Sequence, residues 1–114
     1  MAKISGDTLR GHLETMVLAA LARGEAHGYE ITRRLEGWGS GLLNLQEGTL
    51  YPALYRLEGA GCIRGRWEEK PAGIRGPRRR TYRLTSKGRK ELSRRQESWR
   101  SFVTVVGGIL EGAT

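Results

Sequence analysis

Apolar residues recur every three or four positions in four segments of the chain, which is the period of an amphipathic α-helix. The first predicted helix starts at a cap formed by Asp7 or Thr8 and ends at Gly24. The second starts around Ala26–His27 and is broken by the glycines from Gly37 onward. The apolar positions on these two helices are Leu9, Leu13, Met16, Val17, Ala20 and Leu21, then Tyr29, Ile31 and Leu35, with Trp38 near the same side.

The third and fourth predicted helices follow the same rule. The third runs from Glu47 to Glu58 and contains Pro52, which removes one N–H donor near its first turn. Thr85 caps the fourth, whose apolar stripe is too long for a small N-terminal domain to cover alone. The apolar positions are Leu50, Ala53, Leu54 and Leu57 on the third helix, and Leu92, Trp99, Phe102, Val103, Val106 and Leu110 on the fourth.

Between these two helices the pattern changes to that of a β-hairpin. Cys62–Glu69 and Arg79–Leu84 predict its strands, Lys70–Pro77 its loop, and Leu42–Leu45 a further minimal strand. The resulting fold class is mainly α with a small β-hairpin: a winged helix-turn-helix over residues 1–85 and a C-terminal dimerisation helix over 86–114. In that architecture the third helix enters the DNA major groove, and the hairpin lies along the backbone or minor groove.

The charge distribution supports a polyanionic partner. The 114 residues carry a formal net charge of +8, and residues 64–83 alone hold eight basic and two acidic side chains. A local excess of this size favours double-stranded DNA as the partner, although a solvated basic face is the simpler alternative.

Other function classes are disfavoured by what the sequence lacks. One cysteine and two histidines make a disulfide or a structural zinc site improbable, and no nucleophile pair, carboxylate pair or phosphate loop indicates an enzyme or a bound cofactor. No apolar run approaches the length of a membrane span, and no signal-peptide pattern is present. We therefore expect a cytoplasmic protein that is not an enzyme and needs no metal.

A set of short motifs identifies a family. In their order and spacing they resemble the PadR family of bacterial transcriptional regulators, although each motif is weak alone. The resemblance runs from about Leu9 to Trp99. The motifs are His27–Ile31 (HGYEI), Gly48–Leu54 (GTLYPAL), Arg56–Glu58, Gly61–Ile63, Arg78–Arg80, Tyr82–Thr85 (YRLT) and Gly88.

The resemblance implies a homodimeric winged-helix repressor that reads a near-palindromic operator. One helix after Thr85 matches the short-tailed subgroup, in which the first and last helices build the dimer interface. Family members commonly repress their own genes or genes for efflux and detoxification, and many respond to a small, often aromatic effector. The interface residues predicted here are Leu9, Leu13, Met16, Leu92, Trp99, Phe102, Val103, Val106 and Leu110.

Three departures from the family pattern bear on these expectations. Gln46-Glu47 stands where members often have a Ser or Asp cap before the recognition helix, although Glu47 still complements the helix dipole. The hairpin tip is extended. Gly107-Gly108 in the last helix predicts either that the helix ends there or that another backbone crosses closely.

The predicted DNA contacts lie on three elements. Thr49, Tyr51, Tyr55 and Arg56 lie off the apolar stripe of the third helix, where they can reach bases and phosphates; alternatively the tyrosines pack under the hairpin. In the hairpin, Arg75, Arg78 and Arg79 are expected on the backbone or minor groove, whereas strand alternation favours Arg80 pointing back toward the body. On the second helix, Arg33 and Arg34 are either phosphate clamps or ordinary surface arginines.

Several other residues are expected to be structural: His27 at a helix start, Tyr29 on an apolar side, Cys62 as a buried inert thiol and Trp67 packed on the hairpin.

Trp99 carries the effector prediction. It resembles the tryptophan that, in multidrug-binding members of the family, faces its symmetry mate across a central pore and stacks on flat aromatic ligands. The match places Gln96, Val103, Thr8, His12 and Thr15 around the same pore; the alternative is that Trp99 fills the dimer core.

A different function is also compatible with the winged helix: an RNA-binding or protein-docking module without ligand sensing. RNA recognition usually relies on exposed aromatic residues, whereas the aromatics of this chain fall on apolar helical faces by their spacing.

Overall fold

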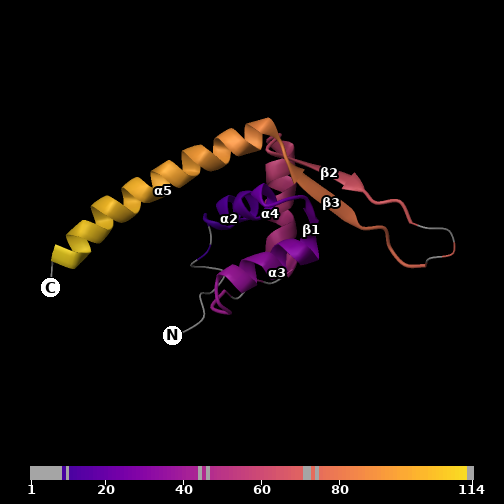
Figure 1. The fold of residues 1–114 in the computed structure, drawn as a ribbon, viewed down its shortest axis with the longest axis horizontal. Helices are drawn as coiled ribbons and strands as arrows, with labels where there is room; N and C mark the ends of the chain where they lie inside the picture. Colours follow the sequence, from indigo (N-terminus) through magenta and orange to yellow (C-terminus); the bar gives the residue numbers. More distant parts are fainter. Residues whose placement is uncertain are drawn as a thin grey trace.

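The computed structural model describes residues 9, 11–43, 45, 47–70, 73 and 75–112. These residues form four helices and a three-stranded antiparallel sheet in the order α2, β1, α3, α4, β2, β3, α5. The mainly α fold with a small β-sheet that the sequence predicted is therefore confirmed, whereas the dimerisation role of the last helix stays a prediction. Figure 1 shows a small helical body with the hairpin β2–β3 extending to one side and α5 to the other. The bounds are Leu13–Ala22, Ala26–His27, Gly28–Trp38, Glu47–Gly59, Ile63–Trp67, Arg80–Leu84 and Ser86–Gly112, respectively.

The first helix is shorter than its apolar pattern predicts. Gly11 has a φ of +91°, which a right-handed helix cannot contain, so α2 begins only at Leu13. Leu9 is nevertheless buried, so the apolar period continues across a break in the backbone. The predicted caps Asp7 and Thr8 lie outside the described residues.

The third strand is not where the sequence placed it. β1 is Ala26–His27, and it pairs with β3 through Ala26 opposite Tyr82 and His27 opposite Thr81. Of the predicted strand Leu42–Leu45, Leu43 makes an isolated bridge and Leu42 and Leu45 lie in no strand, so the prediction is wrong for these described residues; Asn44 lies outside them. β2 pairs with β3 from Ile63 opposite Leu84 to Trp67 opposite Arg80, and the sheet order is β1-β3-β2.

The core is formed by the predicted stripes of α2, α3 and α4, closed by one face of the sheet and by Leu92 of α5. Leu50, Ala53, Leu54 and Leu57 are all buried, as their spacing predicts. Cys62 is buried with a free thiol, also as predicted. Of the four apolar positions predicted on α3, only Ile31 and Leu35 are buried, whereas Tyr29 and Trp38 are exposed, so the predicted apolar side of this helix is narrower than its sequence indicates.

The start of α5 is fixed against the hairpin. Thr85 Oγ1 accepts a hydrogen bond from the backbone N–H of Gly88 at 3.0 Å, which confirms the predicted cap. Gly88 lies against the backbone of Cys62, and a Cβ at position 88 would overlap the Cys62 carbonyl oxygen. The helix then runs to Gly112 without a break, so the alternative that it ends at Gly107-Gly108 is wrong. Apart from the backbone of α5 itself and the adjacent residues, no described atom lies within 4 Å of a Cβ built at Gly107 or Gly108.

Candidate nucleic-acid interface

The recognition-helix candidate α4 has one buried and one exposed side. The exposed side carries the residues predicted to meet DNA, Thr49, Tyr51, Tyr55 and Arg56. Among the large hydrophobic side chains of the described residues, Tyr55 is the most exposed, with 81% of its surface accessible. Because the opposite side fills the core, this surface can face a partner without loss of packing.

Arg56 already has a protein partner. Its Nε donates to Glu14 Oε2 of α2 at 2.8 Å. The other Glu14 oxygen lies 3.7 Å from Arg95 Nη2 of α5, so one carboxylate joins three helices. Arg95 and Arg94 also donate hydrogen bonds to Glu91, which lower the pKa of that carboxyl to about 2.

The two tyrosines of α4 differ in their surroundings. A Cβ built at Gly28 would lie 2.9 Å from the Tyr51 hydroxyl, so this ring packs on the first residue of α3. Tyr51 is thus partly a packing residue, although it packs on α3 rather than under the hairpin and about half of it is exposed. Tyr55 follows one turn later and is the freer of the two.

The arginines of the hairpin separate into outer and inner groups. Arg75, Arg78 and Arg79 are exposed. Arg78 Nε donates to the carbonyl oxygen of Glu68 at 3.3 Å, which steadies its stem on the opposite side of the loop. Arg80 points back toward the body, as predicted, and its Nη2 donates to Glu58 of α4 at 2.7 Å.

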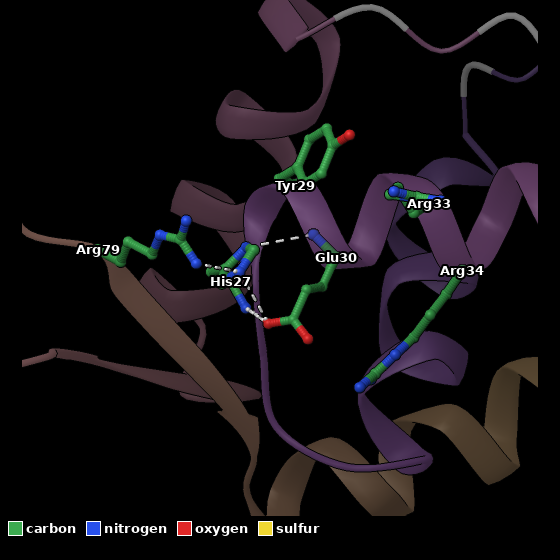
Figure 2. Close-up of a pocket in the computed structure, with 6 residues that line it drawn as sticks. All are labelled: His27, Tyr29, Glu30, Arg33, Arg34 and Arg79. Carbon is green, nitrogen blue, oxygen red and sulfur yellow. Dashed lines mark hydrogen bonds and ion pairs between the residues drawn. The ribbon is translucent and has the colours of Figure 1, made fainter.

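Figure 2 shows an open hollow between the start of α3 and the hairpin. It has a volume of about 430 Å³ and is lined by His27, Tyr29, Glu30, Arg33, Arg34 and Arg79. His27 caps α3: its Nδ1 accepts the N–H of Glu30 at 3.3 Å, and Glu30 Oε1 accepts the N–H of His27 at 3.3 Å. His27 is therefore the helix-start residue that the sequence predicted, and its Nε2 lies 3.2 Å from Arg79 Nη1.

Arg33 and Arg34 have different roles. Arg34 Nη1 donates to the carbonyl oxygens of Ala20 and Gly24 at 3.0 and 2.8 Å, so it closes the C-terminal end of α2. These bonds give Arg34 a structural role in the chain, and its predicted phosphate contact stays a prediction. Arg33 is exposed, with its guanidinium 5.7 Å from the centre of the Tyr29 ring.

Sequence reasoning missed a pair of arginines on the hairpin. Arg64 and Arg83 lie directly opposite each other in the register of β2 and β3, and both are exposed. Like charges in this position are unfavourable unless an anion compensates them, and neither has an acidic partner within the described part of the chain. Strand alternation, applied to the basic positions as well as the apolar ones, would have placed them together.

The exposure of the aromatic residues also differs from the prediction. Tyr29, Tyr51, Tyr55 and Trp67 are each more than half exposed. The expectation that the aromatics lie on apolar helical faces is therefore wrong for Tyr29, whereas Tyr51 and Tyr55 are exposed as their positions off the apolar stripe predict. Trp38 is about half exposed, beneath the Arg23 guanidinium at 5.2 Å. Large rings at the surface are available for contact with a partner.

The predicted interface residues fall into two groups. Leu9, Leu13 and Leu92 are buried within the chain, and Met16 packs against the same core. The distal part of α5 is different: its apolar side chains are partly or fully exposed, and the exposed Val105 and Ile109 join the predicted set. Those of the predicted residues that remain partly or fully exposed are Trp99, Phe102, Val103, Val106 and Leu110.

Trp99 has neighbours on two sides. Its ring stacks on Phe102 with centroids 5.8 Å apart and meets His12 edge-on at 5.4 Å. Thr15 accepts a hydrogen bond from Arg95 at 3.4 Å, and Gln96 is exposed. Thr8, the remaining predicted pore residue, lies outside the described residues.

Comparison with known proteins identifies the class of protein to which the chain belongs. Residues 17–94 match the model of the transcriptional regulator PadR-like family. The chain is similar to the solved structure of a transcriptional regulator from Clostridium thermocellum, with 33% identity, coverage of 92% of this chain and 96% of that one, and a TM-score of 0.81. A PadR family regulator from Eggerthella lenta is 30% identical, with coverage of 92% and 87% and a TM-score of 0.78.

A curated relative from Lysinibacillus sphaericus, named "Uncharacterized protein X", is 28% identical over 109 residues, which are 96% of this chain and 97% of that protein.

The fold and the exposed α4 surface define a winged-helix DNA-binding protein. The chain belongs to the PadR-like family of transcriptional regulators, whose members regulate transcription by binding DNA and are not enzymes. Among the described residues, no helix is both long and apolar enough to cross a membrane.

Proposed function

We propose that the protein is a homodimeric, sequence-specific repressor that binds a near-palindromic operator. In this proposal α4 enters the major groove, and the hairpin loop follows the backbone or the minor groove. The observation that carries it is the division of α4: four side chains build the core, while Thr49, Tyr55 and Arg56 face outward beside a hairpin that holds Arg75, Arg78 and Arg79. Residues up to Thr85 form the reading head, and α5 forms the dimer arm.

The exposed apolar side chains on the distal part of α5 support the proposal of a dimer. A helix that leaves the body and exposes Phe102, Val105, Ile109 and Leu110 is poorly stabilised alone, because most helical stability comes from packing of an apolar face. A second copy of α5 supplies that packing. In a two-fold dimer, the bare backbone at Gly107-Gly108 leaves room for the partner helix to cross closely.

Salt dependence tests the DNA contacts. Arg78→Ala and Arg79→Ala are each expected to lower the slope of log affinity against log salt by about 1 on all duplexes, because each removes one phosphate contact. Arg56→Ala should instead weaken operator binding by roughly 1–3 kcal/mol and relax base preference. The probes are an operator duplex selected from a random library and an unrelated duplex of equal length. An unchanged slope in the double hairpin variant would show that the hairpin does not contact phosphate.

An RNA-binding role is the second candidate, because five aromatic side chains among the described residues are more than half exposed: Tyr29, Tyr51, Tyr55, Trp67 and Phe102. Unpaired bases stack on such rings, whereas duplex recognition needs no unpaired base. Competition of hairpin RNA and single strands against the selected duplex separates the two functions: tighter binding of either competitor than of any duplex would overturn the repressor proposal.

We further propose that a small, flat aromatic effector binds at Trp99 in the dimer and releases DNA. About half of Trp99 is exposed, and Phe102 and His12 already offer one stacked and one edge-on ring contact. An indole face attracts π-systems and cations. Such a ligand acts only if it prefers a separation of the two reading heads that does not fit the operator, since equal affinity for both states shifts nothing.

The effector test measures operator release and ligand binding together. Planar cationic and phenolic compounds are titrated into wild type, Trp99→Ala and Trp38→Phe, with binding followed by calorimetry so that loss of the indole does not remove the signal. We expect Trp99→Ala to bind about tenfold more weakly and Trp38→Phe to behave as wild type. Equal affinity in all three proteins would leave Trp99 as a core residue of the dimer.

A further inference from the structure

Trp67 lies between the two elements that are proposed to contact DNA, α4 and the hairpin loop. It is the last residue of β2, and Figure 1 shows that this end of the strand lies beyond α4 and before the hairpin loop. The residue is 53% exposed, although an indole is a large apolar surface. The sequence predicted only that it packs on the hairpin, and this does not account for the exposed half of the ring.

The ring is held in position by a cation. The Arg80 guanidinium lies over the Trp67 ring, with Cζ 5.2 Å from the ring centre, and the two residues are direct partners in the β2–β3 register. Arg80 in turn donates to Glu58 Oε2 of α4 at 2.7 Å. The Arg80 guanidinium therefore contacts both the Trp67 indole and α4, and links the position of the ring to that of the helix.

The local sequence makes room for this arrangement. Glu58 Oε2 also accepts the backbone N–H of Gly65 at 3.1 Å, which fixes the carboxylate on the strand. A Cβ at Gly65 would lie 2.5 Å from Arg80 Nε, so any larger residue there would displace the guanidinium. Glycine at position 65 is what allows Arg80 to lie between Glu58 and Trp67.

We propose that Trp67 is a DNA contact of a kind not carried by the arginines: its exposed ring surface packs on the deoxyribose edge of the strand that separates the two grooves. This inference rests on the proposed function. If α4 lies in the major groove and the hairpin loop meets the adjacent minor groove, the sugar-phosphate strand between the grooves must pass the end of β2. An exposed indole there meets the apolar carbon and hydrogen atoms of the sugars rather than a phosphate. A ring already held by Arg80 loses little conformational freedom on binding.

The proposed Trp67 contact should change DNA affinity and its salt dependence differently from a phosphate contact. Sugars are the same at every base pair, so Trp67→Ala should weaken binding of operator and unrelated duplex alike, by about tenfold, through lost burial of the ring. Because no charge is removed, the salt slope should remain that of wild type. Trp67→Phe, which keeps a ring, should stay within about twofold of wild type. Arg78→Ala is the matched control on the same hairpin, since it should lower the slope.

Fluorescence provides a second measurement that does not depend on how Trp67→Ala folds. In a Trp38→Phe/Trp99→Phe protein, Trp67 is the only tryptophan. Mixed-sequence duplex should change its emission in a saturable way and protect it from acrylamide quenching. Glu58→Gln, which weakens the hold on Arg80, should reduce this protection at saturating DNA.

The outcomes separate this inference from the function on which it rests. If Arg78→Ala loses affinity while Trp67→Ala binds as wild type and the indole stays equally accessible to acrylamide, the protein binds duplex DNA and the Trp67 contact is refuted. Stronger protection by single strands than by duplex would also refute it, since the ring would then be stacking on unpaired bases. If no variant binds any duplex, the proposed function fails and the inference fails with it.

Discussion

Replacing Phe102 and Leu110 together by glutamate should convert the protein to a monomer and lower operator affinity by roughly 100-fold or more. Both side chains are more than half exposed on the part of α5 that leaves the body. In the proposed dimer, each glutamate would bring a charge into an apolar interface, which costs several kcal/mol per unpaired ion. Affinity then falls because two linked half-site contacts become two independent ones.

The matched control carries the same charges on the opposite side of the same helix, as Ser101→Glu and Thr104→Glu. Light scattering and band-shift titration measure mass and affinity, and circular dichroism monitors folding. The monomer should stay folded, because the core cluster is built from residues 13–92. A dimeric Phe102/Leu110 double variant would show that this face of α5 is not the interface.

Gly88→Ala is expected to destabilise the fold by about 3 kcal/mol, at the upper end of the range for overpacking. A Cβ at this position overlaps the carbonyl oxygen of Cys62 and lies 2.8 Å from Leu84 Cδ1. The first of these neighbours is backbone that is itself bonded to the N–H of Thr85 at 3.0 Å, so it cannot move without breaking the hairpin end. The melting temperature should fall by roughly 10 °C in thermal unfolding followed by circular dichroism.

Gly37→Ala is the control for the intrinsic effect of the substitution. Apart from the backbone of α3 itself and the adjacent residues, no atom of the described residues lies within 4 Å of a Cβ built at Gly37, which is within α3. Alanine there should stabilise by about 0.5–1 kcal/mol, because glycine is a poor helix former. If both variants melted at the temperature of wild type, α5 would not be fixed to the hairpin through Gly88 as the structure describes.

The helical part of the fold could be predicted because its signals are local. The stripe Leu50, Ala53, Leu54 and Leu57 repeats within α4 itself, and spacing alone assigns its buried side. β1 could not be predicted in this way, because it has only two residues and is defined by pairing with residues 81 and 82, more than 50 positions later. The start of α2 was misplaced for a different reason: the apolar period continues to Leu9, while the backbone at Gly11 does not.

The candidate site was predicted less completely than the fold. The exposed positions of α4 follow from the same helical period that identifies its core. The partners of the arginines do not follow from any local pattern: Arg34 closes α2, and Arg80 reaches Glu58, through contacts 10 or more positions apart. Trp67 was treated as an apolar residue, whereas a cation stacked on one part of its ring holds the rest at the surface.

In the proposed DNA complex, the carboxylate of Glu14 competes with DNA for Arg56. A guanidinium that turns fully from α4 into the groove gives up the hydrogen bond from Arg56 Nε to Glu14 at 2.8 Å. The released carboxylate then has Arg95 of the dimer arm as its remaining cation, at 3.7 Å. An ion pair this exposed is worth only about 0–1 kcal/mol, so the exchange is a small adjustment rather than a gate. Thermodynamic linkage nevertheless requires the coupling between the two ion pairs of Glu14 to be reciprocal. Any movement of α5 that strengthens the Glu14–Arg95 contact makes Arg56 easier to release to a base. Binding of α4 in the groove then favours the approach of α2 to α5 by the same free energy.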